Sequence, residues 1–226
     1  MYRVEDKFLC DRKELYVLQQ RLNGILQNDH IRNEDGYIIT SVYFDDVFDT
    51  HLRDTIEGHY KREKYRIRIY NHSFDVIKLE VKFKEKNRIK KISKTISKED
   101  MFRLLRGECI EEENDSLESA VTLFNLAIKC RALKPKVIVE YDRRAFIHEM
   151  GNVRITLDRG LRYSKQVTLF GKEEIEYYHT KEWQNVLEVK YDEFLPEFIA
   201  QMVEMGNLRQ NSFSKYQICR QEMGEM

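Results

Sequence analysis

The sequence lacks an excess of charge of either sign. Its 226 residues include 39 Lys or Arg and 39 Asp or Glu, so the formal net charge is zero. A neutral chain has no bulk electrostatic attraction for nucleic acid or for an anionic membrane surface. We therefore expect no nucleic acid among its partners.

Cysteine, proline and long apolar segments are also scarce. The four cysteines are scattered without a C-x-x-C pair, which argues against a zinc site or a disulfide framework and indicates reduced thiols. No apolar run reaches 18 residues, so we expect no membrane span. The first ten residues lack the apolar stretch of a signal peptide. These features predict a cytoplasmic protein.

Two prolines and nine glycines leave no segment with the composition of a flexible linker. The length suits one domain with a substantial core, and we expect residues 1–226 to form it. Its charges are unevenly spread: residues 60–94 hold 13 Lys or Arg and four acids, whereas residues 97–120 hold eight acids and three bases. A local anion site is therefore compatible with a neutral chain.

Several segments alternate like β-strands, but one face of each carries charge. Arg66 and Arg68 are two residues apart, as are Glu80, Lys82 and Lys84. Because side chains two apart share one face of a strand, each segment has a charged face and an apolar face. The same step recurs in four further segments: Glu5 and Lys7, Tyr141 and Arg143, Arg154, Thr156 and Asp158, and Glu188 and Lys190.

The pattern along the chain predicts mainly strands, with helices between and after them. Strands are expected at 2–9, 37–44, 64–71, 76–84, 88–95, 136–147, 152–158 and 185–191, with a further hairpin element at 173–178. Helices are expected at 11–27, within 45–57, after Ser97, and at 116–130, 193–206 and 212–222. Asp11 and Ser97 are suited to cap helices, and Asp45 to cap the segment that follows it.

About eight antiparallel strands can close into a barrel whose interior holds side chains or one small ligand. We therefore predict an α+β fold built on a closed antiparallel β-barrel. Amphipathic helices would cover the apolar outer faces, and the charged faces would line a tunnel.

A tunnel of this kind needs a ligand, because burying unpaired charge is costly. The candidate carboxylates are fewer than the cations: Glu5, Glu80, Glu140, Asp158 and Glu188. A linear polyanion would accept charge-assisted bonds from the surplus Lys and Arg. The glutamates suit Mg²⁺ or Mn²⁺ bridging to phosphate oxygens, since hard cations prefer oxygen ligands.

Nine short motifs resemble, in order, one known family. They are E-x-K at 5–7, S-x-Y-F-D at 41–45, R-x-R-x-Y at 66–70, E-x-K-x-K at 80–84, the basic run 90–94, K-P-x-V-x-V-x-Y-x-R-x-A-F at 134–146, R-x-T-x-D at 154–158, L-E-x-K at 187–190 and S-K-Y at 214–216. The chain resembles the polyphosphate polymerase domain of the vacuolar transporter chaperone (VTC) complex. That domain is a member of the triphosphate tunnel metalloenzymes, also called CYTH-like.

The resemblance implies a tunnel in which ATP donates its terminal phosphoryl group to a growing polyphosphate chain, with Mn²⁺ or Mg²⁺. It implies catalytic roles for Lys7, Arg66, Arg68, Lys82, Arg143 and Arg154. It implies phosphate binding by Arg53, Lys84, Lys91, Lys94, Tyr141, Lys190, Ser214 and Lys215. The metal would bind Glu188, with Glu80 and Glu5 as further candidates.

The chain departs from the family in two respects. The eukaryotic polymerase carries a phosphate-sensing SPX domain and membrane helices, which are absent here, so the chain resembles a standalone bacterial-type member. The wider superfamily begins with E-x-E-x-K, whereas Glu5–Lys7 keeps one glutamate in phase, as the polymerases do, which weakens the assignment as a hydrolase. Two alternatives stay open, a triphosphate or polyphosphate hydrolase and a non-catalytic polyphosphate-binding module. RNA-end processing is a more remote one.

Other residues are interpreted as structural. The six histidines show no ligand spacing and are predicted to lie at the surface or in loops. Trp183 is expected to pack near one end of the tunnel, and the acidic run 111–113 is expected to be a solvated loop.

Overall fold

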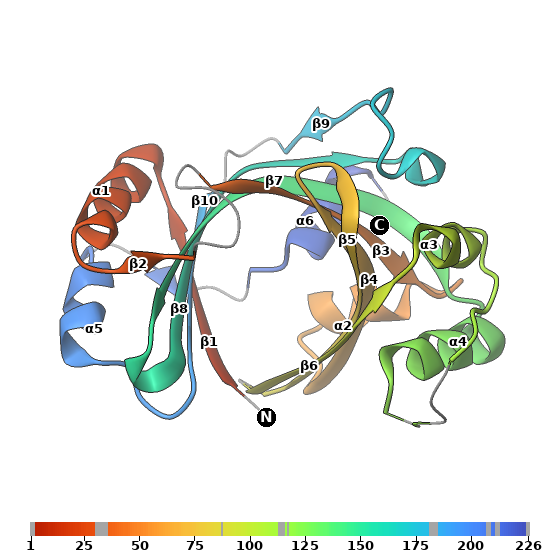
Figure 1. The fold of residues 1–226 in the computed structure, drawn as a ribbon, viewed down its shortest axis with the longest axis horizontal. Coiled ribbons are helices and arrows are strands. Elements are labelled where there is room, and N and C mark those ends of the chain that lie inside the picture. The colour runs from red at the N-terminus through yellow and green to blue at the C-terminus, as the bar shows by residue number, and fades with distance from the viewer. Residues whose placement is uncertain are drawn as a thin grey trace.

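Eight antiparallel strands close into a barrel around an open centre, as predicted (Figure 1). The structure is a computed structural model that describes residues 3–29, 36–86, 88–112, 116, 118–180, 185–206, 209–210 and 213–224. The barrel strands are β1 (Arg3–Cys10), β3 (Tyr37–Asp45), β4 (Lys61–Tyr70), β5 (Ser73–Glu85), β6 (Arg88–Ile96), β7 (Lys134–His148), β8 (Val153–Ser164) and β10 (Asn185–Tyr191).

The strands follow the order β7-β3-β4-β5-β6-β1-β10-β8, and β8 pairs with β7 to close the ring. Among the described residues, the seam between β6 and β1 is the shortest of the ring, with two residue pairs, Arg3 with Ile89 and Val4 with Arg88. The turn predicted near Gly151 joins β7 to β8. Gly151 has a φ of 76°, and a Cβ there would lie 2.5 Å from the carbonyl oxygen of Phe194.

Over most of the barrel, apolar side chains point outward and polar side chains point into the barrel. On β5, Leu79 and Val81 are fully buried against the helices outside, whereas Lys82 lines the interior. On β8, Ile155 and Leu157 pack outside and Arg154 lines the interior. The two-residue period of a strand therefore separates an apolar outer layer from a charged lumen.

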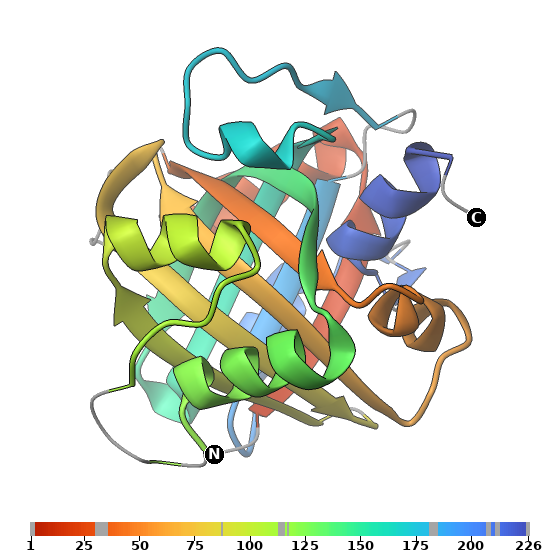
Figure 2. The same ribbon diagram turned by 90° about the vertical axis from the view of Figure 1, so that its right-hand side faces the viewer.

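Helices cover the outside of the barrel on two sides (Figures 1 and 2). Helices α3 (Lys98–Leu105) and α4 (Ala120–Arg131) cover β3–β6, with Phe124 edge-on to Phe44 at 5.3 Å. Helices α1 (Arg12–Asn23) and α5 (Glu197–Val203) cover β1, β8 and β10.

Two further helices, α2 (Thr50–Ile56) and α6 (Lys215–Glu222), pack together at one end of the barrel. Tyr216 and Cys219 of α6 are buried against Val137 and Val139, whose side chains lie on the interior face of β7. This end of the lumen is therefore filled by an apolar plug.

The caps predicted from the sequence are present. Asp11 forms a capping box with Glu14, and Ser97 accepts a hydrogen bond from the backbone N–H of Asp100 at 3.0 Å. Asp45 accepts bonds from the N–H groups of His51 and Leu52, in the first turn of α2, at 3.0 and 2.9 Å.

Some predicted elements differ from the structure. The helix expected at 11–27 ends at Asn23 and is followed by β2 (Gln27–Asn28), and the one expected at 193–206 is the shorter α5. The hairpin element expected at 173–178 is wrong: only β9 (Tyr178–His179) pairs there, outside the ring. A third short strand, β11 (Arg209–Gln210), pairs with β1.

Two interpretations of single residues are wrong. His51 is 2% exposed, with Nδ1 2.9 Å from Asp45 Oδ1, so it is a core residue rather than a surface residue. Glu112, in the acidic run, is partly buried and pairs with Lys94 at 2.5 Å. Trp183 lies outside the described residues. No helix within the described ranges is long and apolar enough to cross a membrane.

Candidate functional site

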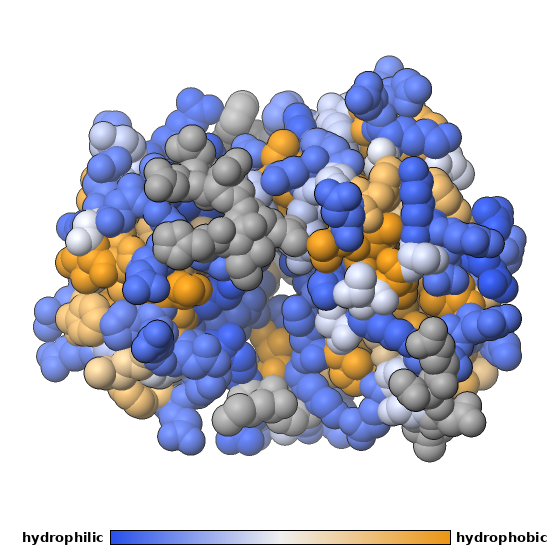
Figure 3. Space-filling view, in the orientation of Figure 1, coloured by the Kyte–Doolittle hydropathy of each residue, from blue (hydrophilic) through white to orange (hydrophobic). Residues whose placement is uncertain are grey.

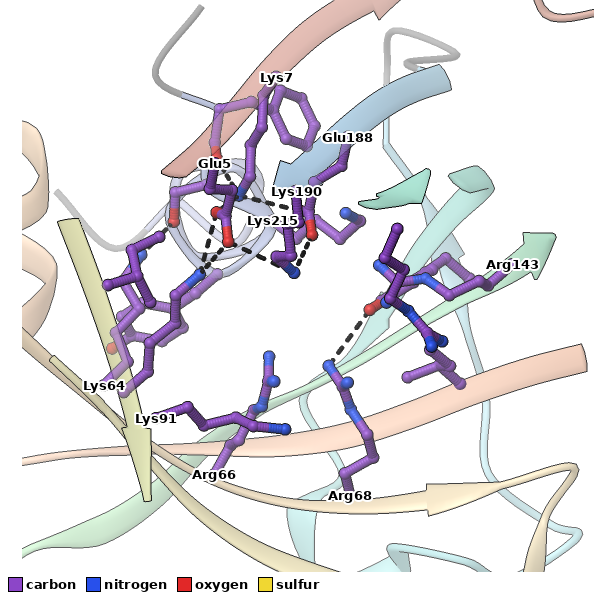
Figure 4. A pocket seen from close by; sticks show the side chains of 18 of the residues that line it. Glu5, Lys7, Lys64, Arg66, Arg68, Lys91, Arg143, Glu188, Lys190 and Lys215 are labelled. Atoms are coloured by element: carbon purple, nitrogen blue, oxygen red, sulfur yellow. Dashed lines mark hydrogen bonds and ion pairs between the residues drawn. The ribbon is translucent and has the colours of Figure 1, made fainter. Parts of the chain in front are cut away.

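The barrel encloses a cavity of about 580 Å³, lined mainly by charged side chains from its strands. Figure 3 shows a hollow at the middle of this face, and Figure 4 shows the side chains that point into it. The cationic lining residues are Arg3, Lys7, Lys64, Arg66, Arg68, Lys82, Lys91, Arg143, Arg154, Lys190 and Lys215. The acidic ones are Glu5, Asp29 and Glu188.

Two more carboxylates, Glu80 and Asp158, lie behind the lining and pair with its arginines. Eleven cations against five carboxylates leave a formal excess of six positive charges among the described residues. The lumen is therefore strongly cationic inside a molecule that is neutral as a whole.

The wall formed by β1, β5 and β10 carries two of the three carboxylates that line the cavity. Glu5 pairs with Lys7 at 3.0 Å, Lys82 at 3.1 Å and Lys190 at 3.4 Å. Glu188 pairs with Lys7 at 3.4 Å and with Lys190. Burial and the neighbouring Glu188 oppose ionisation of Glu5, but the three lysines outweigh them and lower its pKa. Both glutamates are therefore carboxylates at neutral pH.

Lys82, on the same wall, has an unusual pKa. Burial disfavours its charged form and, together with repulsion from Lys7 and Lys190, outweighs the attraction of Glu5. The pKa of Lys82 is therefore lowered from 10.5 to about 7. Its charge is therefore poised to respond to an anion in the cavity.

The wall on β4, which pairs with β5, is built on arginine. Arg66 donates to Glu80 at 2.6 Å and to the Tyr43 hydroxyl at 3.0 Å. Arg68 donates to Ser41 at 3.1 Å and to the Tyr141 hydroxyl at 3.2 Å. Glu80 also accepts from Lys91 at 2.8 Å and is only 1% exposed. These bonds fix the direction of both guanidinium groups.

A third cluster joins β7, β8 and α6. Arg143 forms a two-pronged pair with Asp158, with both bonds at 2.6 Å, and Lys215 Nζ lies 2.6 Å from the same carboxylate. Although burial opposes ionisation of Tyr141, the cations Arg143, Arg68 and Lys215 lower its pKa. Its hydroxyl is therefore a strong hydrogen-bond donor toward an anion.

At the edge of the cavity Arg154 pairs with Asp29 at 2.5 Å and donates to the Tyr37 hydroxyl at 3.1 Å. Asp29 follows β2 in a loop, where strand alternation gives no signal for it. Arg154 nevertheless lies where the alternation on β8 predicted it.

Lys64 is the most informative lining residue that the motifs missed. It donates to the Ser214 hydroxyl at 2.7 Å, and no carboxylate pairs with it among the described residues. Burial, and then repulsion from Lys7, Lys82, Arg62 and Lys84, holds its pKa well below the usual range. Its position two residues before Arg66 would have identified it by alternation alone.

Most residues predicted for the site meet in this cavity. They are Glu5, Lys7, Arg66, Arg68, Lys82, Lys91, Tyr141, Arg143, Arg154, Glu188, Lys190, Ser214 and Lys215. Four others do not line it. Arg53 is exposed on α2, and Lys94 shares the outer face of β6 with Ile92 and Ile96. Lys84 lies in an adjoining cavity, and Glu80 lies behind its cations.

The expectation that Glu140 faces the lumen is wrong. Thr40 and Tyr177 donate to it at 2.6 and 2.7 Å, and Arg162 also pairs with it. Thr40 lies on the same face of β3 as Val42, whose side chain packs outside the barrel. Glu140 is therefore a buried carboxylate of the outer shell, beneath the segment that leads to β9.

The donors on the Glu5–Glu188 wall fit a hard divalent cation. Mg²⁺ commonly binds one or two carboxylates and completes its coordination with water and substrate phosphates. The described residues contain no cluster of three or more His, Cys, Asp or Glu placed to hold a metal by themselves. Any metal here would therefore need oxygens from the ligand as well as Glu188 and Glu5.

The fold and its lining define the protein as a β-barrel tunnel protein with a cationic lumen. A protein-family model described as the VTC domain matches residues 2–223. The chain belongs to the VTC domain family.

Solved structures of the same fold come from distant organisms. A putative adenylyl cyclase from Hippeastrum, described as having a dominant triphosphatase activity, superposes with a TM-score of 0.56 at 13% identity, over 100% of this chain and 96% of its own. A putative adenylate cyclase from Bacillus halodurans gives 0.52 at 15% identity, over 89% and 84%. At such identities the likeness shows the fold. A search of curated proteins finds no match.

Proposed function

We propose that the lumen binds ATP and inorganic polyphosphate and transfers the terminal phosphoryl group of ATP to the end of the chain. The observation that carries this proposal is the formal excess of six positive charges in a cavity where Glu5 and Glu188 lie together among lysines. A linear array of phosphates supplies many acceptor oxygens for such a surface.

The step requires no nucleophilic side chain. An oxygen of the chain's terminal phosphate attacks the γ-phosphorus of ATP, forming a new P–O bond. The bond from that phosphorus to the β,γ-bridging oxygen breaks, and ADP leaves with the electron pair. Phosphoryl transfer of this kind depends mainly on positioning and electrostatic stabilisation.

The protein's contribution is a set of fixed donors. Arg66 and Arg68 are held by Glu80 and Ser41, and Arg143 by Asp158, so these groups need little reorganisation when charge develops on the phosphoryl oxygens. Lys7 of β1 and Lys82 of β5 line the same cavity. A divalent metal bound by Glu188 and Glu5 would neutralise charge on the phosphates.

Incubation with ATP and Mn²⁺ tests this function, with ADP, free phosphate and polymer measured in one reaction. We expect ADP and polymer to form together. A folded protein that binds ATP but yields neither product would refute the polymerase.

Hydrolysis is the second candidate, because Glu5 gives the metal wall a second carboxylate beside Glu188. A hydrolase would release phosphate from ATP or tripolyphosphate without chain growth. The products distinguish the two reactions, and Glu5→Gln tests whether Glu5 positions the attacking water, since phosphate release would then be lost. Its conservative control is Glu118→Gln, at an exposed carboxylate that pairs with Lys90 outside the barrel.

A further inference from the structure

A second cavity, of about 820 Å³, adjoins the lumen and differs from it in chemistry. The two share Phe213 and Ser214, which directly precede α6. Arg62, Lys84 and Lys86 line the second cavity, and no Asp or Glu lies among its described lining residues. Beside the lumen, across Phe213 and Ser214, there is therefore a space with cations and without carboxylates among its described lining residues.

The cations of this second cavity form no ion pair within the part of the chain that the structure describes, although the charge of Asp54 favours the charged form of Arg62. Arg62 makes one long hydrogen bond, 3.4 Å, to the carbonyl of Thr55, and Lys86 lies over the Tyr60 ring at 5.3 Å. No ion pair to Lys84 is found among the described residues. Burial, followed by mutual repulsion with Arg62 and Lys7, lowers the pKa of Lys84. A bound anion would stabilise the charged forms of these groups through charge-assisted hydrogen bonds.

Lys64 connects the two spaces. It lines the lumen, donates to Ser214 at the shared boundary, and feels the charges of Lys7 and Lys82 on one side and of Arg62 and Lys84 on the other. In the register of β4 and β5, Lys64 lies opposite Lys82 and Arg62 opposite Lys84, so the cations of the two cavities follow one another along this strand pair.

We propose that Arg62 and Lys84 form a second anion site that binds the part of a long polyphosphate chain extending beyond the lumen, so that the protein distinguishes long chains from triphosphates. The inference rests on the proposed function for the identity of the anion. Without a carboxylate in its lining, this site binds phosphates without a metal.

Binding assays with Arg62→Gln/Lys84→Gln test the site, using tripolyphosphate and a long-chain polyphosphate in the presence of EDTA. We expect affinity for the long chain to fall about tenfold or more, because two charge-assisted contacts are lost, while affinity for tripolyphosphate stays unchanged. The matched control, Lys61→Gln/Lys90→Gln, removes two charges that pair with Glu85 and Glu118 away from both cavities. It should change neither affinity.

The melting temperature separates a binding role from a structural one. Since Arg62 and Lys84 repel each other, their neutral replacements should melt no lower than the wild type. Equal loss of both ligands, no loss of either, or an equal loss in the control would overturn the proposal. Equally tight binding of single-stranded RNA at the same residues would make this a nucleic-acid site instead.

The assay contains no nucleotide and measures no turnover. Failure of polymerisation therefore leaves its result intact, and failure of chain-length discrimination leaves the polymerase proposal intact.

Discussion

At the scale of single residues, lysines that line the same lumen have pKa values shifted in opposite directions. Lys7 lies near both Glu5 and Glu188, and its pKa is raised although burial opposes the charge. Lys64 and Lys82, which line the same cavity, have lowered pKa values because burial disfavours their charged form and neighbouring cations repel it. The pKa values of these lysines thus differ because their surroundings differ. An anionic ligand would offset the excess of positive charge in the lumen.

Lys82 gives a prediction about pH. Its pKa of about 7 leaves it largely neutral at pH 8 in the free protein, whereas bound phosphate favours the ammonium form. We expect tripolyphosphate binding at pH 8 to take up protons and to weaken as pH rises above 7. Calorimetry in two buffers of different ionisation enthalpy measures the uptake, which should shrink in Lys82→Gln. Buffer-independent heats for the wild type would contradict the assignment.

The same shift has a defined sign for stability. Between about pH 7 and pH 10.5 the unfolded chain retains the Lys82 proton that the folded protein has lost. The unfolded state therefore binds more protons, and this residue makes the free energy of unfolding rise with pH across that window.

Glu80 predicts how the arginine wall responds to mutation. Arg66→Gln/Arg68→Gln leaves this 1% exposed carboxylate with Lys91 alone. Breaking a buried pair costs about 3–5 kcal/mol of unfolding free energy. We expect denaturant unfolding to show that loss, and Arg66→Gln/Arg68→Gln/Glu80→Gln to recover most of it. Turnover should stay absent in both variants, because the phosphate-binding cations are gone. Activity in the triple variant would contradict their catalytic role.

At the scale of elements, α6 links the plugged end of the barrel to the arginine wall. Tyr216 donates to Asp45 at 2.6 Å, accepts from Arg220 at 2.9 Å and stacks on Tyr43 at 5.2 Å. Tyr43 in turn accepts the bond from Arg66. The helix therefore serves the fold through its buried face, while Ser214 and Lys215 at its start face the lumen.

Tyr216→Phe tests how much the buried hydrogen bonds of α6 contribute to the stability of the fold. The substitution removes a partner from buried Asp45 and from Arg220, so we expect the free energy of unfolding to fall by about 1–3 kcal/mol. Tyr16→Phe, whose side chain is exposed on α1, is the control and should unfold like the wild type. Equal stabilities of Tyr216→Phe and the control would show that the network contributes nothing.

At the scale of the whole molecule, charge is sorted between inside and outside. The chain is formally neutral, so the positive excess in the lumen is matched by a negative excess elsewhere. Excess negative charge outside the lumen does not attract nucleic acid. A small or linear polyanion can enter the lumen, where most of the charged side chains are cations.

This sorting predicts that the free protein is stabilised by its ligand. Tripolyphosphate at about 100 times its dissociation constant should add about 2.7 kcal/mol to the free energy of unfolding. For a chain of this size that corresponds to a rise of about 5–10 °C in melting temperature. Thermal denaturation measures it, with sodium sulfate at equal ionic strength as the control. An equal rise with sulfate would indicate screening rather than a site.

The sequence by itself determined the barrel and most of its lining. Charged residues at two-residue steps identified the inner faces of β4, β5, β8 and β10, because residues two apart in a strand lie on the same face of the sheet. The same rule places Lys64 and Lys91 inside and Lys94 outside. The nine ordered motifs identified the family, which the VTC domain match confirms.

Only the tertiary structure decided what each charge contacts. It turned Glu140 outward, buried His51 beside Asp45, brought Asp29 from a loop to Arg154, and joined Ser214 to Lys64 across 150 positions. Strand period fixes a side chain's face but not its neighbours, which depend on how the ring closes and where the loops and α6 pack. Since pKa and ligand affinity depend on those neighbours, the charge state of the lumen follows from the closed barrel.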